Sequence, residues 1–85
     1  MLEREITITN PTGLHARPAT LLVKKASSFK SDLFIECNGK KANIKSLIGV
    51  LSLGVTSGAN IKLIASGDDE TLAVEEITKL INTLE

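Results

Sequence analysis

The sequence predicts an α+β domain with the element order β-α-β-β-α-β-α, in which three helices cover one face of a four-stranded sheet. Period-2 alternation of apolar residues marks four short segments, apolar residues at helical spacing mark two helices, and an N-cap and a glycine stop mark a third. Because every predicted strand is apolar on one face and every helix along one stripe, the simplest packing puts all helices on the same side. A length of 85 residues suits one core, so we expect residues 1–85 to form a single domain.

The chain opens with a predicted strand over residues 2–9, where Ile6 and Ile8 share one face. The turn-forming residues 10–13 end this strand. A helix is predicted from Ala16 to Phe29, because apolar residues recur there at helical spacing. Its apolar stripe consists of Ala19, Leu22, Val23, Ala26 and Phe29.

A β-hairpin is predicted next. Residues 32–37 alternate between apolar and polar, and Asn38-Gly39 follows directly, a pair that accepts the positive φ angles of a type I′ turn. Residues 40–44 should therefore return antiparallel to the preceding strand. Parity places Cys37 inward as a small buried hydrophobe and Phe34 on the open face of the sheet.

The last part of the chain predicts a short helix, a strand and a longer helix. Ser46 is a preferred N-cap residue, and Gly54 suits the C-terminal stop of a helix of about two turns. Residues 60–66 alternate as the fourth strand. Asp69 and its acidic neighbour suit the start of the final helix. The buried stripe of that helix consists of Leu72 or Ala73, followed by Ile77, Leu80, Ile81 and Leu84.

Composition argues against one class of function, nucleic-acid binding. Ten basic residues balance ten acidic ones and only two residues are aromatic, which argues against nucleic-acid binding. The charge is nonetheless uneven, with seven bases against two acids in residues 10–45 and one base against six acids in residues 66–85. We expect the basic part to steer an acidic partner or an anionic group towards this region.

We expect a monomer in a reducing cytoplasm. One cysteine excludes an internal disulfide, and no leader or long apolar run indicates secretion or membrane insertion. One histidine and one cysteine provide too few soft ligands for a tetrahedral zinc site within one chain. No metal, nucleotide or other cofactor is required by the sequence.

The only histidine, His15, lies where the first helix is predicted to begin, and Arg17 follows it. The free amides and the positive dipole end of a helix favour an anion there, and a guanidinium adds donors suited to phosphate. His15 could instead merely cap the helix. A Ser-His-Asp hydrolase fits poorly, because acids are sparse nearby and no nucleophile-elbow motif is present. The remaining chemical role is that of the imidazole as a nucleophile that accepts a group and passes it on.

Ser46 allows two interpretations, a simple N-cap or a regulatory phosphorylation site whose added charge the helix dipole would tolerate. The short helix that follows has more apolar residues than it can bury along one stripe. Some of them must face outwards, and an exposed apolar patch is a candidate docking surface. These residues are Leu47, Ile48, Val50, Leu51 and Leu53.

With these residues identified, the chain closely resembles the HPr family, the histidine-containing phosphocarrier proteins of the bacterial phosphoenolpyruvate-dependent sugar phosphotransferase system. The specific motifs are the sequences of residues 12–19, 38–41 and 45–54. The resemblance implies an open-faced β-sandwich with an antiparallel sheet. It also implies that Nδ1 of His15 accepts a phosphoryl group from phosphorylated enzyme I and donates it to the EIIA domains of sugar permeases, with Arg17 stabilising the phosphorylated imidazole.

The resemblance further implies a secondary phosphate environment at Thr12 and Ala16. The context of Ser46 is similar to that of the Gram-positive branch, which implies phosphorylation by HPr kinase/phosphorylase and binding to the catabolite control protein. Partner docking carries over to Thr20, Leu21, Lys24, Leu47, Ile48 and Leu51.

Two other functions remain open. A regulatory-only paralogue would act through Ser46 alone, but such paralogues lack the active histidine, which this chain has. A generic protein-binding module would leave the Gly-His-Arg context unexplained. The carrier function makes the chain a stoichiometric participant in a phosphoryl relay and not an enzyme.

Overall fold

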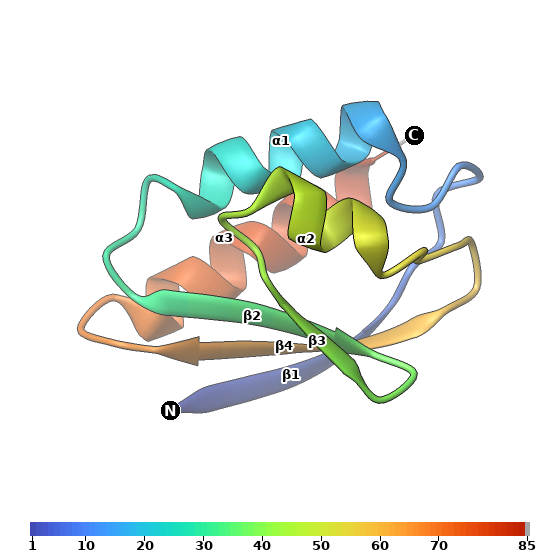
Figure 1. Ribbon diagram of the computed structural model, residues 1–85. Helices are drawn as coiled ribbons and strands as arrows, with labels where there is room; N and C mark the ends of the chain where they lie inside the picture. The colour runs from blue at the N-terminus through green and yellow to red at the C-terminus, as the bar shows by residue number, and fades with distance from the viewer. Residues whose placement is uncertain (85) are drawn as a thin grey trace.

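The computed structural model describes residues 1–84 and confirms the predicted fold class and element order. Four antiparallel strands form one sheet, and three helices lie together on one of its faces, which gives the open-faced sandwich seen in Figure 1. The elements are β1 (Leu2–Thr7), α1 (Ala16–Ala26), β2 (Asp32–Cys37), β3 (Lys40–Asn43), α2 (Leu47–Ser52), β4 (Asn60–Ser66) and α3 (Glu70–Thr83).

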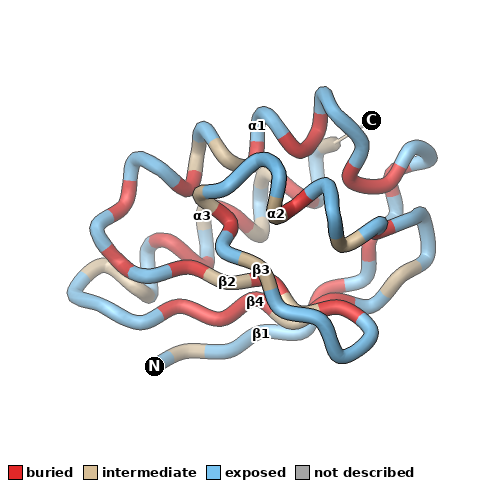
Figure 2. Tube along the Cα trace, in the orientation of Figure 1, coloured by how far each residue is buried: buried red, intermediate tan, exposed pale blue. Residues whose placement is uncertain are grey.

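The strand order is β1-β4-β2-β3, so the last strand in sequence lies between the first two. β4 pairs antiparallel with both neighbours, and its register places Ile61 opposite Ile6 and Leu63 opposite Ile35. These inward residues meet the apolar stripes of the helices and form one core. Figure 2 shows the buried segments of the strands and helices in red. The core therefore lies on the helical side of the sheet.

The hairpin between β2 and β3 has the predicted geometry. Asn38 has φ 54° and Gly39 has φ 80°, as a turn with two positive φ angles requires. Cys37 is buried and free, as parity predicted. Phe34 does face the open side, where it is half-buried beneath the Lys41 ammonium, 4.5 Å from the ring centroid, a cation–π contact.

Three elements end earlier than predicted. α1 ends at Ala26, three residues before Phe29, because the hydroxyls of Ser27 and Ser28 donate to carbonyls of the last turn. Phe29 is still buried, so its apolar character reflects packing beyond the helix end. β1 ends at Thr7 and β3 at Asn43, although the backbone of the next residue makes a further hydrogen bond in each case.

The N-terminus of α3 is tied to the loop that precedes β2. Asp69 precedes α3, but its carboxylate makes no capping bond within the helix. It accepts hydrogen bonds from the backbone N–H groups of Lys30 and Ser31, each at 2.9 Å, and from the Ser31 hydroxyl. The Ser31 hydroxyl and the Lys30 amide lower the pKa of Asp69 to about 2. In the α3 stripe, Ala73 is the buried choice and Leu72 is exposed.

Candidate functional site

His15 occupies the N-cap position of α1, and its side chain is exposed. Its backbone is extended (φ −78°, ψ −172°), and its carbonyl accepts the Ala19 N–H at 2.8 Å to open the helix. The imidazole makes no capping hydrogen bond, so it does not stabilise α1 as a side-chain cap. The helix-capping interpretation of His15 is therefore not supported, and the ring is available for chemistry.

Backbone donors lie directly beside this imidazole. Within residues 1–84, the N–H groups of Ala16 and Arg17 donate to no protein acceptor. Pro18, the third helical residue, has no N–H, and its tolerance at this position agrees with the prediction. Two free amides and the positive end of the helix dipole thus favour an anion next to His15. The Arg17 side chain is exposed and pairs with no carboxylate in the described part of the chain.

The loop that delivers His15 is fixed by close backbone contacts. Gly13 has φ +62°, and a Cβ atom there would lie 2.5 Å from the Val55 carbonyl oxygen. The next residue, Leu14, is buried and donates its N–H to the same carbonyl at 3.0 Å. The backbone before His15 is therefore packed against the segment after α2.

Five of the predicted site residues line one surface depression of about 620 Å³, four around His15 and the docking residue Leu21. Thr12, His15, Ala16 and Arg17 come from the start of α1 and the loop before it. The rest of the lining includes a contribution from the end of α3 that sequence reasoning missed. The additional lining residues are Pro18, Leu80, Thr83 and Leu84. The sequence pattern places Leu80 and Leu84 in the buried stripe of the final helix, but both are only half-buried. No feature of the pattern indicates their partial exposure.

Ser46 is the N-cap of α2, as predicted. Its hydroxyl oxygen accepts the N–H of Gly49 at 3.2 Å, while the side chain is exposed. The preceding residue, Lys45, donates its ammonium to the Phe29 carbonyl at 2.8 Å, which ties the start of α2 to the end of the α1 segment. Ser46 is therefore accessible, and its position relative to α1 is fixed.

The predicted docking residues are exposed on neighbouring helices. α1 and α2 lie side by side over the sheet (Figure 1). Ile48 is 81% exposed, and Leu21, which also lines the depression beside His15, is 46% exposed. Leu21 therefore belongs both to the docking set and to the depression beside His15. Its members are Thr20, Leu21, Lys24, Leu47, Ile48 and Leu51, all exposed.

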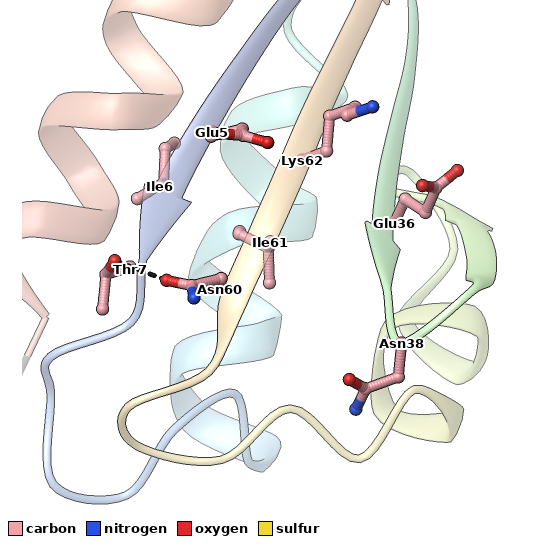
Figure 3. A pocket seen from close by; sticks show the side chains of 8 residues that line it. All are labelled: Glu5, Ile6, Thr7, Glu36, Asn38, Asn60, Ile61 and Lys62. Carbon is pink, nitrogen blue, oxygen red and sulfur yellow. Dashed lines mark hydrogen bonds between the residues drawn. The ribbon is translucent and has the colours of Figure 1, made fainter.

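A second depression, of about 440 Å³, lies on the open face of the sheet and includes none of the predicted site residues. Figure 3 shows its lining, in which Glu5 and Glu36 flank Lys62 and Thr7 is hydrogen-bonded to Asn60. Residues 1–84 contain no cluster of three or more potential metal ligands. None of the helices in that range is long and apolar enough to cross a membrane.

Known proteins resemble this chain in both sequence and fold. The sequence profile of the family described as "PTS HPr component phosphorylation site" matches residues 2–83. The crystal structure of HPr-C-His from Thermoanaerobacter tengcongensis is 49% identical, with 98% of this chain and 93% of that chain covered and a TM-score of 0.95. The phosphocarrier protein HPr from Bacillus anthracis is 35% identical, with coverage of 93% and 94% and a TM-score of 0.90.

The catabolite repression protein Crh of Bacillus subtilis, described as a dimer with a swapping domain, is 43% identical, with coverage of 96% and 94% and a TM-score of 0.77. A family match over nearly the whole chain, with an exposed histidine at the start of α1, leads to one conclusion. This chain belongs to the HPr family of phosphocarrier components of the phosphotransferase system.

Proposed function

We propose that this chain accepts a phosphoryl group on Nδ1 of His15 from phosphorylated enzyme I and donates it to EIIA domains of sugar permeases. The observation that supports this most directly is an exposed imidazole, free of any capping bond, beside the unpaired N–H groups of Ala16 and Arg17. The family match provides the phosphocarrier class.

The transfer needs no cofactor. The lone pair of Nδ1 attacks the phosphorus atom while the bond from phosphorus to its donor atom on enzyme I breaks, and transfer to EIIA repeats the exchange. The proton of the neutral ring stays on Nε2. The negative charge that arrives on His15 would be stabilised by the two amides at the start of α1 and by the Arg17 guanidinium, since Arg17 lines the same depression.

The role is that of a stoichiometric carrier and not of an enzyme. The depression beside His15 is partly open to solvent, and it is lined partly by apolar side chains. Such a surface suits the approach of a protein partner better than the enclosure of a small substrate. We propose that enzyme I and EIIA domains dock on the exposed docking residues of α1 and α2, with Lys24 contributing charge attraction towards acidic partners.

We also propose that Ser46 is a regulatory phosphorylation site for HPr kinase/phosphorylase and that the phosphorylated form binds the catabolite control protein. Ser46 is exposed at a helix N-terminus, where an added phosphate is tolerated by the dipole. Because Leu47, Ile48 and Leu51 follow it on the exposed face of α2, the new charge would act on partner binding.

We also propose that the chain is a monomer located in the cytoplasm. The isolated fold buries its core without a second chain, whereas the Crh relative is described as a swapped dimer. Light scattering of the purified chain at several concentrations should give the mass of one chain, and cell fractionation should place it in the cytoplasmic fraction. A concentration-independent dimer would contradict the monomer.

The carrier function is tested by incubation with active enzyme I and phosphoenolpyruvate. Intact-mass analysis should show one added phosphoryl group that is lost in acid, as expected for phosphohistidine. The Ser46→Ala variant should take up this group normally, and the His15→Ala variant should not. A wild-type chain that remains unmodified beside active enzyme I would refute the carrier function.

The second candidate is a regulatory-only role, which the 43% identity to Crh brings into consideration. A chain with that role would be phosphorylated only at Ser46, with an acid-stable phosphate. Treatment with HPr kinase/phosphorylase and ATP distinguishes the two sites, because the Ser46→Ala variant should lose only the acid-stable adduct. An acid-stable adduct together with no acid-labile one would favour the regulatory role.

A further inference from the structure

The loop before His15 contains a buried polar residue with no role in the function proposed so far. Asn10 is only 2% exposed and lies between β1 and α1. Its side-chain amide nitrogen donates to the Gly13 carbonyl at 2.7 Å and to the Thr12 hydroxyl oxygen at 3.4 Å. Its backbone carbonyl accepts the Gly13 N–H at 3.1 Å. Both backbone polar groups of Gly13 are therefore held by the same residue.

The orientation of this amide follows from its partners. A carbonyl oxygen can only accept, so the NH₂ group of Asn10 and not its oxygen must face Gly13. The Oδ1 atom is buried and accepts no hydrogen bond from any group in residues 1–84. A buried acceptor left without a donor is unfavourable, so the contribution of Asn10 comes from its NH₂ group.

This arrangement leaves the hydrogen of the Thr12 hydroxyl free for an acceptor other than Asn10. Its hydroxyl oxygen accepts from Asn10, which directs the hydroxyl hydrogen towards another acceptor. Thr12 is exposed and lines the same depression as His15 and Arg17. The Gly13 carbonyl, by contrast, is engaged in a buried bond, which keeps its negative end away from an anion in the depression.

We propose that Asn10 is a positioning residue for the phosphorylated state. Its NH₂ group orients the Thr12 hydroxyl as a hydrogen-bond donor to the phosphoryl group on His15 and holds the Gly13 carbonyl inside the loop. This proposal rests on the carrier function proposed above. Asn10 touches no reacting atom, and it acts through its two neighbours.

The test is a competition for phosphoryl groups at equilibrium. Wild type and a variant are mixed in equal amounts with catalytic enzyme I and limiting phosphoenolpyruvate, and intact mass gives the share of phosphoryl groups on each chain. Loss of one hydrogen bond to the phosphoryl group should favour wild type over Asn10→Ala by about threefold to tenfold. Thr12→Val should show a similar loss, and the double variant should lose no more than the larger single effect.

Ser31→Ala is the matched control. Ser31 is also buried, at 1% exposure, and its hydroxyl is bonded to Asp69 at the other end of α1. This variant should lose stability yet share phosphoryl groups equally with wild type, which separates positioning from general destabilisation.

Any one of four outcomes would overturn the proposal. Equal sharing between wild type and a folded Asn10→Ala variant would do so, as would additive losses in the double variant. If Asn10→Ala does not fold, equal sharing with the exposed-site variant Thr12→Val overturns it instead. A wild-type chain that takes up no phosphoryl group overturns the carrier function as well, whereas normal uptake with equal sharing overturns only the role of Asn10.

Discussion

Gly13 provides a quantitative test of how the loop before His15 is built. A methyl group at this position would lie 2.5 Å from the Val55 carbonyl oxygen and 2.8 Å from the Thr56 Cα atom. Both are backbone atoms, so no side-chain rotation can relieve the overlap. The φ angle of +62° adds a second cost, because L residues with a Cβ rarely adopt it.

The two costs can be separated, because Gly54 has the same φ angle of +62° and has no neighbouring atom within 4 Å of where a methyl group would lie. Gly54→Ala should therefore lose only the backbone term, about 1–2 kcal/mol in the free energy of unfolding. Gly13→Ala should lose that amount and a further cost of overpacking, about 1–3 kcal/mol. For a domain of this size each kcal/mol corresponds to a melting temperature lower by about 4–8 °C.

Urea denaturation of wild type, Gly54→Ala and Gly13→Ala, followed by circular dichroism, measures both terms. We also expect Gly13→Ala to accept phosphoryl groups from enzyme I more slowly than Gly54→Ala, at a temperature where both are folded, because the methyl group displaces the support of His15. If the two variants unfold at the same urea concentration, the close contact between Gly13 and the Val55 segment does not exist in solution.

Three further predictions concern other parts of the fold. The folded pKa of Asp69, about 2, lies below its ordinary 3.8, so its ionised carboxylate stabilises the fold above pH of about 4, and this contribution is lost as the pH falls towards 2. Urea midpoints measured across that range should fall more steeply for wild type than for Asp69→Asn. Ser46→Ala removes the acceptor for the Gly49 N–H and should cost about 1 kcal/mol in the free energy of unfolding, measured by urea denaturation. Ile48→Lys should change stability by less than about 0.5 kcal/mol, since Ile48 is 81% exposed, but it should raise the KM of enzyme I for this chain in a phosphorylation assay.

The fold could be predicted from the sequence because its local signals agree with one another. Alternation in β2 and β4 correctly placed the inward residues, and Asn38-Gly39 has the positive φ angles that its turn type requires. Ser46 caps α2 as its residue type suggested. Each of these signals acts over a few residues, where backbone sterics and hydrogen bonding decide the outcome without help from the rest of the chain.

The parts that could not be predicted depend on contacts between distant segments. The end of α3 borders His15 only because α1 and α3 pack together, and helical periodicity cannot tell a half-buried Leu80 from a buried one. Asp69 is the N-cap residue of α3, as its residue type suggested, yet its carboxylate bonds to the loop that contains Ser31 and not to the helix. The role of Asn10 depends on burial, which a polar residue in a turn sequence does not suggest.

The position of His15 sets a condition on the proposed relay. The imidazole lies in a depression that is also lined by Leu21, one of the exposed docking residues of α1, and α2 packs beside α1. A donor protein and an acceptor protein that both need this surface cannot occupy it together, so the carrier must leave one before it meets the other. During that interval the phosphoryl group is exposed to water and has only local groups to hold it. The amides of Ala16 and Arg17 and a hydroxyl set by Asn10 are such groups, and all belong to the first turn of α1 or the loop before it. A carrier exposed to two partners therefore needs well-placed donors in this loop more than it needs a deep pocket.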